Sequence, residues 1–425
     1  AGIQPLADML YADPTKNPED EAQAFINAEA GFADTKAVLD GARHILIEQF
    51  SEDAALLGKL REYFWQRAQI ISEVVKGKET EGAKYRDYFD FSEALEKIPS
   101  HRAMALFRAR KEGILQLNVD IKDLEAGVRH PCENLIAGFW KIADESRPAD
   151  KWLLEVVRWT WRVKIQSHLQ TDFLTEIRER AEEDAIDVFA KNMKDLLLAA
   201  PAGKKVTIGL DPGLRTGVKM SVVDENGKVL DHGAIFPNQP QNKIAEAAAI
   251  LLKLCQKYSV QLISIGNGTA SRETDAFVAT LLKAHPELKA QRVIVNESGA
   301  SVYSASELAA LEFPDLDVTI RGAVSIARRL QDPLPELVKI DPKSIGVGQY
   351  QHDVSQVKLT RSLDGVVEDC VNAVGVDVNS ASVPLLKRVS GLNQTLVNNI
   401  IEYRDANGAF KSRAESFTRD ERYAS

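Results

Sequence analysis

The sequence lacks long apolar stretches and is poor in cysteine. No run approaches the roughly 20 consecutive apolar residues that cross a bilayer, so no membrane contact is expected. Cys132, Cys255 and Cys370 lie far apart, form no Cys-X-X-Cys metal motif and are odd in number, which argues against a disulfide framework. The 7 histidines are scattered, so zinc is not expected. These absences favour a reducing cytoplasm.

The length and composition are those of an ordinary globular protein. At 425 residues the chain has room for about two to four domains, and 44% hydrophobic with 27% charged residues is typical of a soluble fold. Its start, Ala1-Gly2-Ile3, has neither an initiator Met nor the basic and apolar regions of a signal peptide. We interpret this start as the cut end of a longer chain.

The sequence has fewer basic than acidic residues. The chain has 53 Lys and Arg against 62 Asp and Glu, a formal net charge of −9. Because proteins that coat nucleic acid non-specifically are usually basic, this balance argues against such a role for the chain as a whole. Phosphate binding would need a local basic patch or backbone amides.

Residues 1–200 show mainly helical periodicity. Thr35–Phe50 places apolar residues on one face at intervals of three and four, and Trp152–Leu169 does the same with Trp152, Val156, Trp159, Val163 and Ile165. Tryptophans at that spacing are typical of a core rather than of ligand stacking. Lys111–Ile121 alternates like a strand and predicts a small insertion.

The periodicity changes over residues 204–335. Three strand-like runs come first, with Asn226-Gly227 as the hairpin turn between the second and third, and helical and strand-like runs then alternate. This order predicts a mixed sheet covered by helices, in the order of an RNase H-like domain. The expected strands are 205–210, 218–223, 228–235, 261–265 and 292–295, and the expected helices are 244–258, 274–284 and 323–330.

The remaining chain reads as a connection followed by a helical hairpin. Residues 336–380 predict a connecting segment that is irregular from about residue 345, and residues 381–415 predict helix, tight turn and helix. Asn407-Gly408 ends the second helix, and 416–425 forms an atypical tail. The expected fold is therefore an α plus α/β multidomain protein.

Two carboxylates are candidates for metal binding. Asp211 follows a short strand in the turn Gly209-Leu210-Asp211-Pro212-Gly213, and Glu297 follows another short strand. Neighbouring strands would bring both to one sheet edge, where carboxylates suit Mg²⁺. Two-metal phosphodiester hydrolysis requires several carboxylates, so two acids provide few ligands for two metal ions.

The turn between the last two expected helices is the candidate phosphate-binding site. Small or turn-forming residues there leave backbone N–H groups of the following helix free for an anion. Residues 384–419 hold six Lys or Arg against three acids. An ordinary hairpin with a solvated basic face is the alternative. The candidate residues are Lys387, Arg388, Ser390, Gly391, Leu392, Asn393, Lys411 and Arg413.

A second basic group lies at 321–329. Arg328 and Arg329 fall on the expected helix 323–330, and Arg321 lies at its start. They suit contact with a phosphate backbone or structural ion pairs, and the sequence favours the structural role.

Several strings resemble the Tex family of bacterial transcription accessory proteins. They are Ile265–Thr274 (IGNGTASRET), Ser301–Glu307 (SVYSASE), Ser344–Asp353 (SIGVGQYQHD) and Val367–Asn372 (VEDCVN). The resemblance covers the chain up to about Glu415. It implies a helical N-terminal region, a YqgF/RuvC-like (RNase H-like) domain, helix-hairpin-helix motifs and an S1 RNA-binding domain, and it implies binding of RNA or DNA in the cytoplasm. By this comparison the family's first residues and S1 domain fall outside the sequence.

The resemblance also assigns the site residues. Asp211 and Glu297 match the first two acidic positions of the YqgF-like pattern, whereas the third falls at Arg321 or Gly322. Asn267 stands where related resolvases carry a carboxylate. The hairpin matches at Val389, Gly391 and Leu392, with the αL-tolerant Asn393 in place of a second glycine.

These features lead to one main hypothesis and two alternatives. The main hypothesis is a nucleic-acid-binding transcription accessory core without nuclease activity and without a required cofactor, with at most weak Mg²⁺ binding at Asp211 and Glu297. One alternative is a Mg²⁺- or Mn²⁺-dependent nuclease that recruits Asp353 or Asp369 as the third acid. The other is a scaffold that docks transcription or translation machinery.

Overall fold

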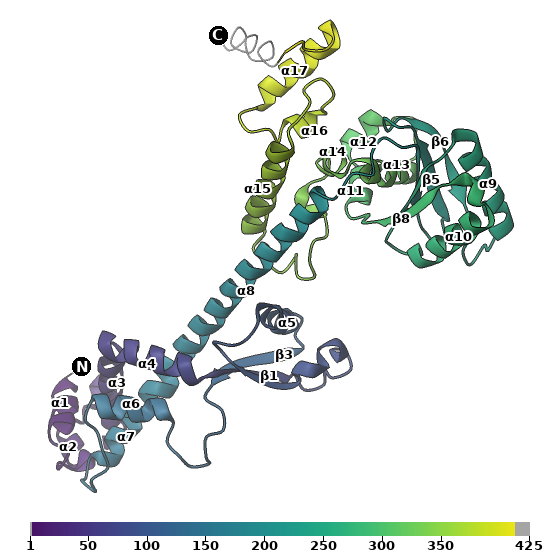
Figure 1. The fold of residues 1–425 in the computed structure, drawn as a ribbon. Helices are drawn as coiled ribbons and strands as arrows, with labels where there is room; N and C mark the ends of the chain where they lie inside the picture. The colour runs from purple at the N-terminus through teal and green to yellow at the C-terminus, as the bar shows by residue number, and fades with distance from the viewer. Residues whose placement is uncertain (1, 413–425) are drawn as a thin grey trace. The chain divides into compact units, whose positions relative to one another are not determined.

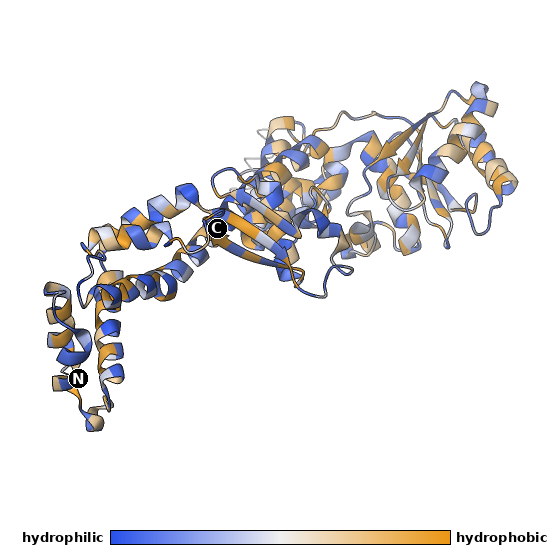
Figure 2. Cartoon of the chain, turned by 90° about the horizontal axis from the view of Figure 1, so that it is seen from below, coloured by the Kyte–Doolittle hydropathy of each residue, from blue (hydrophilic) through white to orange (hydrophobic). Residues whose placement is uncertain are grey.

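The computed structural model describes residues 2–412, which divide into two compact units, one up to Asp184 and one from Ala185 onward (Figure 1). Among the described residues, none of the helices is long and apolar enough to cross a membrane. In Figure 2 the helices carry hydrophobic and hydrophilic residues side by side, as expected when only one helix face is buried. The tail 416–425 and Arg413 lie outside the described residues.

The first unit is mainly helical, as predicted. Its core gathers the fully buried aromatic side chains of Phe64, Trp161 and Phe173, and the rings of Phe64 and Trp161 meet edge to face with centroids 5.1 Å apart. The helices are α1 (Gln4–Ala12), α2 (Pro18–Ala22), α3 (Thr35–Ser51), α4 (Ala54–Arg67), α5 (Ser100–Lys111), α6 (Pro131–Phe139), α7 (Asp150–Trp159) and the first part of α8 (Gln166–Leu197), with short 3₁₀ turns at Gln23–Phe25, Ala28–Ala30 and Ala83–Tyr88.

The apolar face expected over Trp152–Leu169 is only partly correct. Val156 and Ile165 are buried, but Trp159 is 45% exposed and Val163 is 51% exposed. A π-helical turn at Thr160–Ile165 joins α7 to α8. Because a π turn holds more residues than an α turn, it shifts the phase of the helix and brings Trp161 into the core instead.

A three-stranded antiparallel sheet interrupts the helices of this unit. It consists of β1 (Gln69–Val74), β2 (Asp90–Ala94) and β3 (Leu115–Asp120), in the order β2-β1-β3. The predicted strand at 111–121 is β3, whereas β1 and β2 were not predicted. In β1 the buried position 72 is a serine whose Oγ donates to the carbonyl of Tyr88 at 2.6 Å, so apolar alternation alone does not show the strand.

The second unit contains the predicted mixed sheet. Its strands are β4 (Thr207–Asp211), β5 (Val218–Val223), β6 (Val229–Ile235), β7 (Leu262–Gly266) and β8 (Gln291–Val295), in the order β6-β5-β4-β7-β8. The first three pair antiparallel, and β7 and β8 run parallel to β4. This arrangement confirms the RNase H-like interpretation.

Helices cover both faces of this sheet (Figure 1). The side chains of Ile208 and Leu210 on β4 pack with residues of α9 (Ile244–Tyr258) and α10 (Ser271–Ala284). On the other face α13 (Val318–Gln331) lies so close to β4 that a Cβ at Gly209 would fall 2.0 Å from the carbonyl oxygen of Ala323. Since side chains alternate along a strand, Asp211 lies on the α13 face with Gly209.

The rest of the second unit is more helical than predicted. Helix α15 (Gln356–Val374) occupies the segment expected to be a connection, and it buries Leu359, Leu363 and Val367 at helical spacing. The helix was not predicted because glycine favours turns and loops, and Gly346, Gly348 and Gly365 lie before or within this segment. The other elements are α11 (Ala300–Ser304), α12 (Glu307–Glu312), α14 (Pro333–Leu337), α16 (Val383–Leu386), α17 (Gln394–Asn407) and 3₁₀ turns at Pro286–Leu288 and Pro342–Ser344.

Candidate functional site

The charges of Asp211 and Glu297 interact at the carboxyl ends of β4 and β8, which are not neighbouring strands as predicted, because β7 lies between them. Asp211 ends β4 opposite Lys219 on β5, and Glu297 follows β8. Burial, and then the nearby charge of Glu297, raise the pKa of Asp211 to about 6, against the opposing charges of Arg329 and Lys219. Asp211 therefore binds its proton more tightly than an exposed carboxyl does.

The Glu297 carboxylate is seated on a glycine-lined surface of the loop after β7. A Cβ at Gly266 would lie 2.2 Å from Glu297 Oε2, and one at Gly268 would lie 1.7 Å from Oε1, so neither position has room for a side chain there. Oε2 is buried without a hydrogen-bond partner among the described residues. The backbone N–H of Glu297 donates to Asn267 Oδ1 at 3.1 Å, so the Asn267 side chain holds the main chain of Glu297 in position.

Of the two positions that the resemblance offered for a third acid, Gly322 is the one that faces Asp211. A Cβ at Gly322 would lie 3.0 Å from Asp211 Oδ2, so this position of α13 faces the Asp211 carboxylate. Arg321 points elsewhere and donates from Nε to the carbonyl of Phe313 at 3.1 Å. The resemblance left both positions open for the third acid, and the geometry selects Gly322.

A buried guanidinium lies near the two acids. Arg329 is 5% exposed and donates to the backbone carbonyls of Asn296 and Ser298 at 2.8 and 3.0 Å, on either side of Glu297. It also donates to Ser325 Oγ at 3.0 Å. Burial lowers the pKa of Arg329, while the charges of Glu336, Glu297 and Asp211 oppose that change. A buried positive charge therefore lies close enough to both acids to interact with their charges.

A third acidic ligand is not found around this pair. Within residues 2–412, no three His, Cys, Asp or Glu side chains are grouped so that they could hold a metal ion. The charges that shift the pKa of Asp211 are those of Glu297, Arg329 and Lys219, and neither Asp353 nor Asp369 is among them. The donor set does not suit two divalent cations.

Arg328 has the structural role that the sequence favoured. Its NH1 contacts Glu312 Oε2 at 2.9 Å, its Nε donates to the carbonyl of Gly227 at 2.8 Å, and its guanidinium lies over the ring of Phe313. These contacts tie α13 to α12 and to the hairpin turn before β6.

The turn between α16 and α17 has the form expected of a helical hairpin. Gly391 has a φ of 86°, a left-handed conformation that favours glycine. Asn393 does not adopt the left-handed conformation that its place in the motif implied. Its φ is −95°, because it is the N-cap of α17 and its side chain accepts from the N–H of Leu396 at 2.9 Å.

The side chains around this turn differ in what they contact. The Arg388 guanidinium contacts Asp364 Oδ1 at 2.9 Å, and the N–H of Ser390 donates to Asn372 Oδ1 at 3.1 Å. Leu392 is partly buried, and its N–H donates to the carbonyl of Val389 at 3.2 Å. Lys387 and Lys411 are both exposed. Arg388 is therefore held in a structural ion pair.

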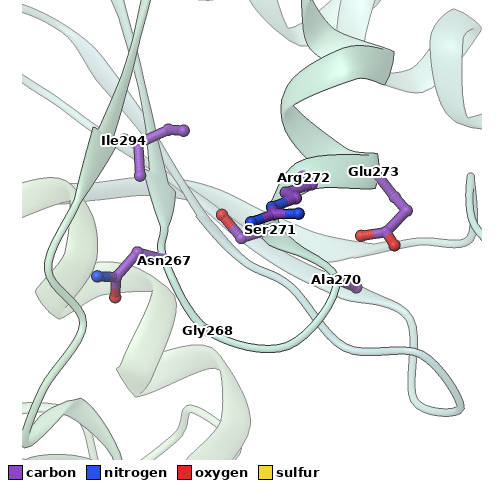
Figure 3. A pocket seen from close by; sticks show the side chains of 7 residues that line it. All are labelled: Asn267, Gly268, Ala270, Ser271, Arg272, Glu273 and Ile294. Atoms are coloured by element: carbon purple, nitrogen blue, oxygen red, sulfur yellow. The ribbon is translucent and has the colours of Figure 1, made fainter.

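The structure adds a pocket that the sequence did not indicate as a site. The loop after β7, the start of α10 and Ile294 on β8 line an open pocket of about 460 Å³ (Figure 3). Apart from Ile294, its residues come from the string that carries the family resemblance, but the string alone gave them no function. The lining residues are Asn267, Gly268, Ala270, Ser271, Arg272, Glu273 and Ile294.

Comparisons with known proteins agree with this architecture. Residues 13–189 match the Tex central region-like family, 205–331 match the Tex protein YqgF-like domain, and 371–415 match the helix-hairpin-helix motif. Protein YhgF of Escherichia coli strain K12 is 59% identical over 417 residues, which are 98% of this chain and 54% of that protein.

Further relatives extend the comparison. The transcriptional accessory protein Tex of Neisseria gonorrhoeae is 56% identical over 97% of this chain and 53% of its own length. The S1 RNA-binding domain-containing protein 1 of Homo sapiens is 36% identical over 88% of this chain and 38% of its own length. The chain thus spans about half the length of the bacterial relatives. From its central region, YqgF-like domain and helical hairpin, the chain belongs to the Tex family.

Proposed function

We propose that this chain binds RNA or DNA through the α16–α17 hairpin, as part of a transcription accessory factor. The observation that carries the proposal is the turn itself, in which the left-handed Gly391 leads into the first turn of α17. First-turn N–H groups have no partner within a helix, and Asn393 takes only that of Leu396. The remaining amides suit a backbone phosphate.

This mode of binding is compatible with the acidic net charge of −9. Backbone amides contribute partial positive charge without basic side chains. Lys387 lies exposed before the turn and adds one cation that can displace counterions from the nucleic acid. Because Arg388 is paired with Asp364, the proposal assigns phosphate contact to Lys387 and the amides rather than to Arg388.

The names of the relatives support the transcriptional part of the proposal. The Neisseria gonorrhoeae relative is named a transcriptional accessory protein, and the human relative is named for an S1 RNA-binding domain. We extend these roles to the present chain as a proposal, in which the helical first unit docks transcription or translation machinery.

We predict that Lys387→Gln reduces the salt dependence of binding. With labelled RNA and single-stranded DNA, the slope of log K against log salt should fall by about 1, the share of one phosphate contact. Arg388→Gln is the matched control because it removes the same charge from the next residue, and it should change the slope much less. A wild-type slope near zero, or equal changes in both variants, would count against the hairpin.

A metal-dependent nuclease is the second candidate, and Asp211 with Glu297 is the observation that favours it. The residues present do not suit that chemistry, since Gly322 occupies the third position and Arg329 supplies a buried positive charge. We propose that the RNase H-like domain acts as a non-hydrolytic scaffold and needs no metal or other cofactor.

A further inference from the structure

The pocket at the start of α10 offers several hydrogen-bond donors. Helix α10 has 14 residues, long enough for its N-terminus to carry a substantial partial positive charge. Of its first amides, Ser271 N–H donates to the carbonyl of Gly268 at 3.2 Å and Thr274 N–H to that of Ala270 at 3.0 Å. The amides of Arg272 and Glu273 have no backbone acceptor among the described residues.

Ser271 supplies an unpartnered polar group. The residue is 8% exposed and lines the pocket, and its hydroxyl has no hydrogen-bond partner among the described residues. The hydroxyl oxygen is not among the fully buried atoms that lack a partner, so it remains accessible from the pocket and can donate to a bound group.

Arg272 adds a cation that the fold leaves available. Its side chain is exposed and lines the pocket, and it forms no ion pair within the described part of the chain. By contrast, Arg292 on β8 is held by Asp275 at 2.8 Å. The acid beside it, Glu273, also lines the pocket, but Figure 3 shows its carboxylate on the other side of the helix start from the Arg272 guanidinium.

We propose that this pocket binds a phosphate group, carried either by a nucleic-acid backbone or by a free nucleotide. The Arg272 guanidinium presents a planar pair of donors that matches two phosphate oxygens, and the Ser271 hydroxyl and the two first-turn amides donate from the helix side. The site is separate from the hairpin and extends the phosphate-binding surface to the RNase H-like domain.

The test compares Arg272→Gln with Lys283→Gln in the full chain. Lys283 is an exposed lysine near the end of the same helix, so both variants remove one positive charge from α10. The probes are thymidine 3′,5′-bisphosphate, titrated by calorimetry, and a labelled oligothymidylate whose affinity is followed against salt. Arg272→Gln should weaken bisphosphate binding at least about tenfold. Ser271→Ala should weaken it by less, and Lys283→Gln should leave it unchanged.

The two probes separate the two sources of the phosphate. Loss of bisphosphate affinity alone assigns the pocket to free nucleotides, whereas a slope for the oligothymidylate that falls by about 1 assigns it to the nucleic-acid backbone. Lys387→Gln should leave bisphosphate affinity intact, so failure of the hairpin proposal is distinguishable from failure of this one. Equal responses of Arg272→Gln and Lys283→Gln to both probes would overturn the proposal.

Discussion

Replacing Arg329 with Met should lower the free energy of unfolding by about 3–5 kcal/mol at pH 8, the usual cost of removing one partner from a buried charged network. The guanidinium is 5% exposed and binds the carbonyls of Asn296 and Ser298 and the hydroxyl of Ser325. Its removal leaves these acceptors unpaired and the nearby acids without a compensating charge. Urea denaturation of the full chain measures the change.

The matched control for this prediction is Arg328→Met. It is the same substitution at the neighbouring position of α13, where the guanidinium meets Glu312 at 2.9 Å with both side chains partly exposed. Partly exposed ion pairs contribute about 1 kcal/mol or less. If both variants lose equal stability, Arg329 has no special role as the internal cation of the acid pair.

Asp211→Asn should stabilise the protein at neutral and alkaline pH, by about 3 kcal/mol at pH 7.5, the equivalent of a pKa raised from 3.8 to about 6. The physical reason is that the folded state buries the charge of Asp211 near Glu297, while asparagine keeps that position neutral at every pH. The measurement is the free energy of unfolding of both proteins as a function of pH.

The sign of this effect follows from proton linkage. The folded state binds the Asp211 proton more tightly than the unfolded chain does. The stability that this proton contributes is therefore fully present below the pKa of the unfolded chain, and it is lost as the pH rises through about 6. The gain from asparagine should therefore be small at pH 4. Asp317→Asn is the control of opposite sign, because contacts with Thr319 lower the pKa of Asp317. A gain for Asp211→Asn that does not depend on pH would contradict the burial argument.

Together these two substitutions test how burial and Arg329 affect the charges of Asp211 and Glu297 in the RNase H-like domain. A functional two-metal site holds its carboxylates ionised around cations. Here burial raises the pKa of Asp211, a glycine stands at the third position, and Arg329 lies beneath the loop that carries Glu297. These features are the basis of our proposal that the domain acts without a metal.

Much of the five-stranded sheet could be predicted because its strands are short apolar runs bounded by turns. The predicted strand 218–223 and helix 244–258 match β5 and α9 at both ends, and β8 begins one residue before the predicted strand. Gly227, with a φ of 83°, forms the turn where Asn226-Gly227 indicated it. Of the three-stranded sheet only β3 was predicted, and the central strand β1 was missed because it buries a serine whose hydrogen bond only the tertiary structure reveals.

The site was less predictable than the fold. Gly322, Ser325 and Arg329 lie three and four residues apart, so the sequence places them on one helix face, but it does not show that this face meets Asp211 and Glu297. Arg388 was expected to contact phosphate, and only the structure reveals its partner on α15. The role of Ser271 likewise depends on burial, which a single serine in a loop does not reveal.

The most direct test of the account measures binding and cleavage on the same samples. Labelled RNA and single-stranded DNA are incubated with Mn²⁺ and either the wild type or Asp211→Asn, and both the bound fraction and the intact fraction are recorded. We predict equal binding by the two proteins and no cleavage by either, because binding depends on the hairpin and the acid set is incomplete. Cleavage by the wild type that disappears in Asp211→Asn would contradict it.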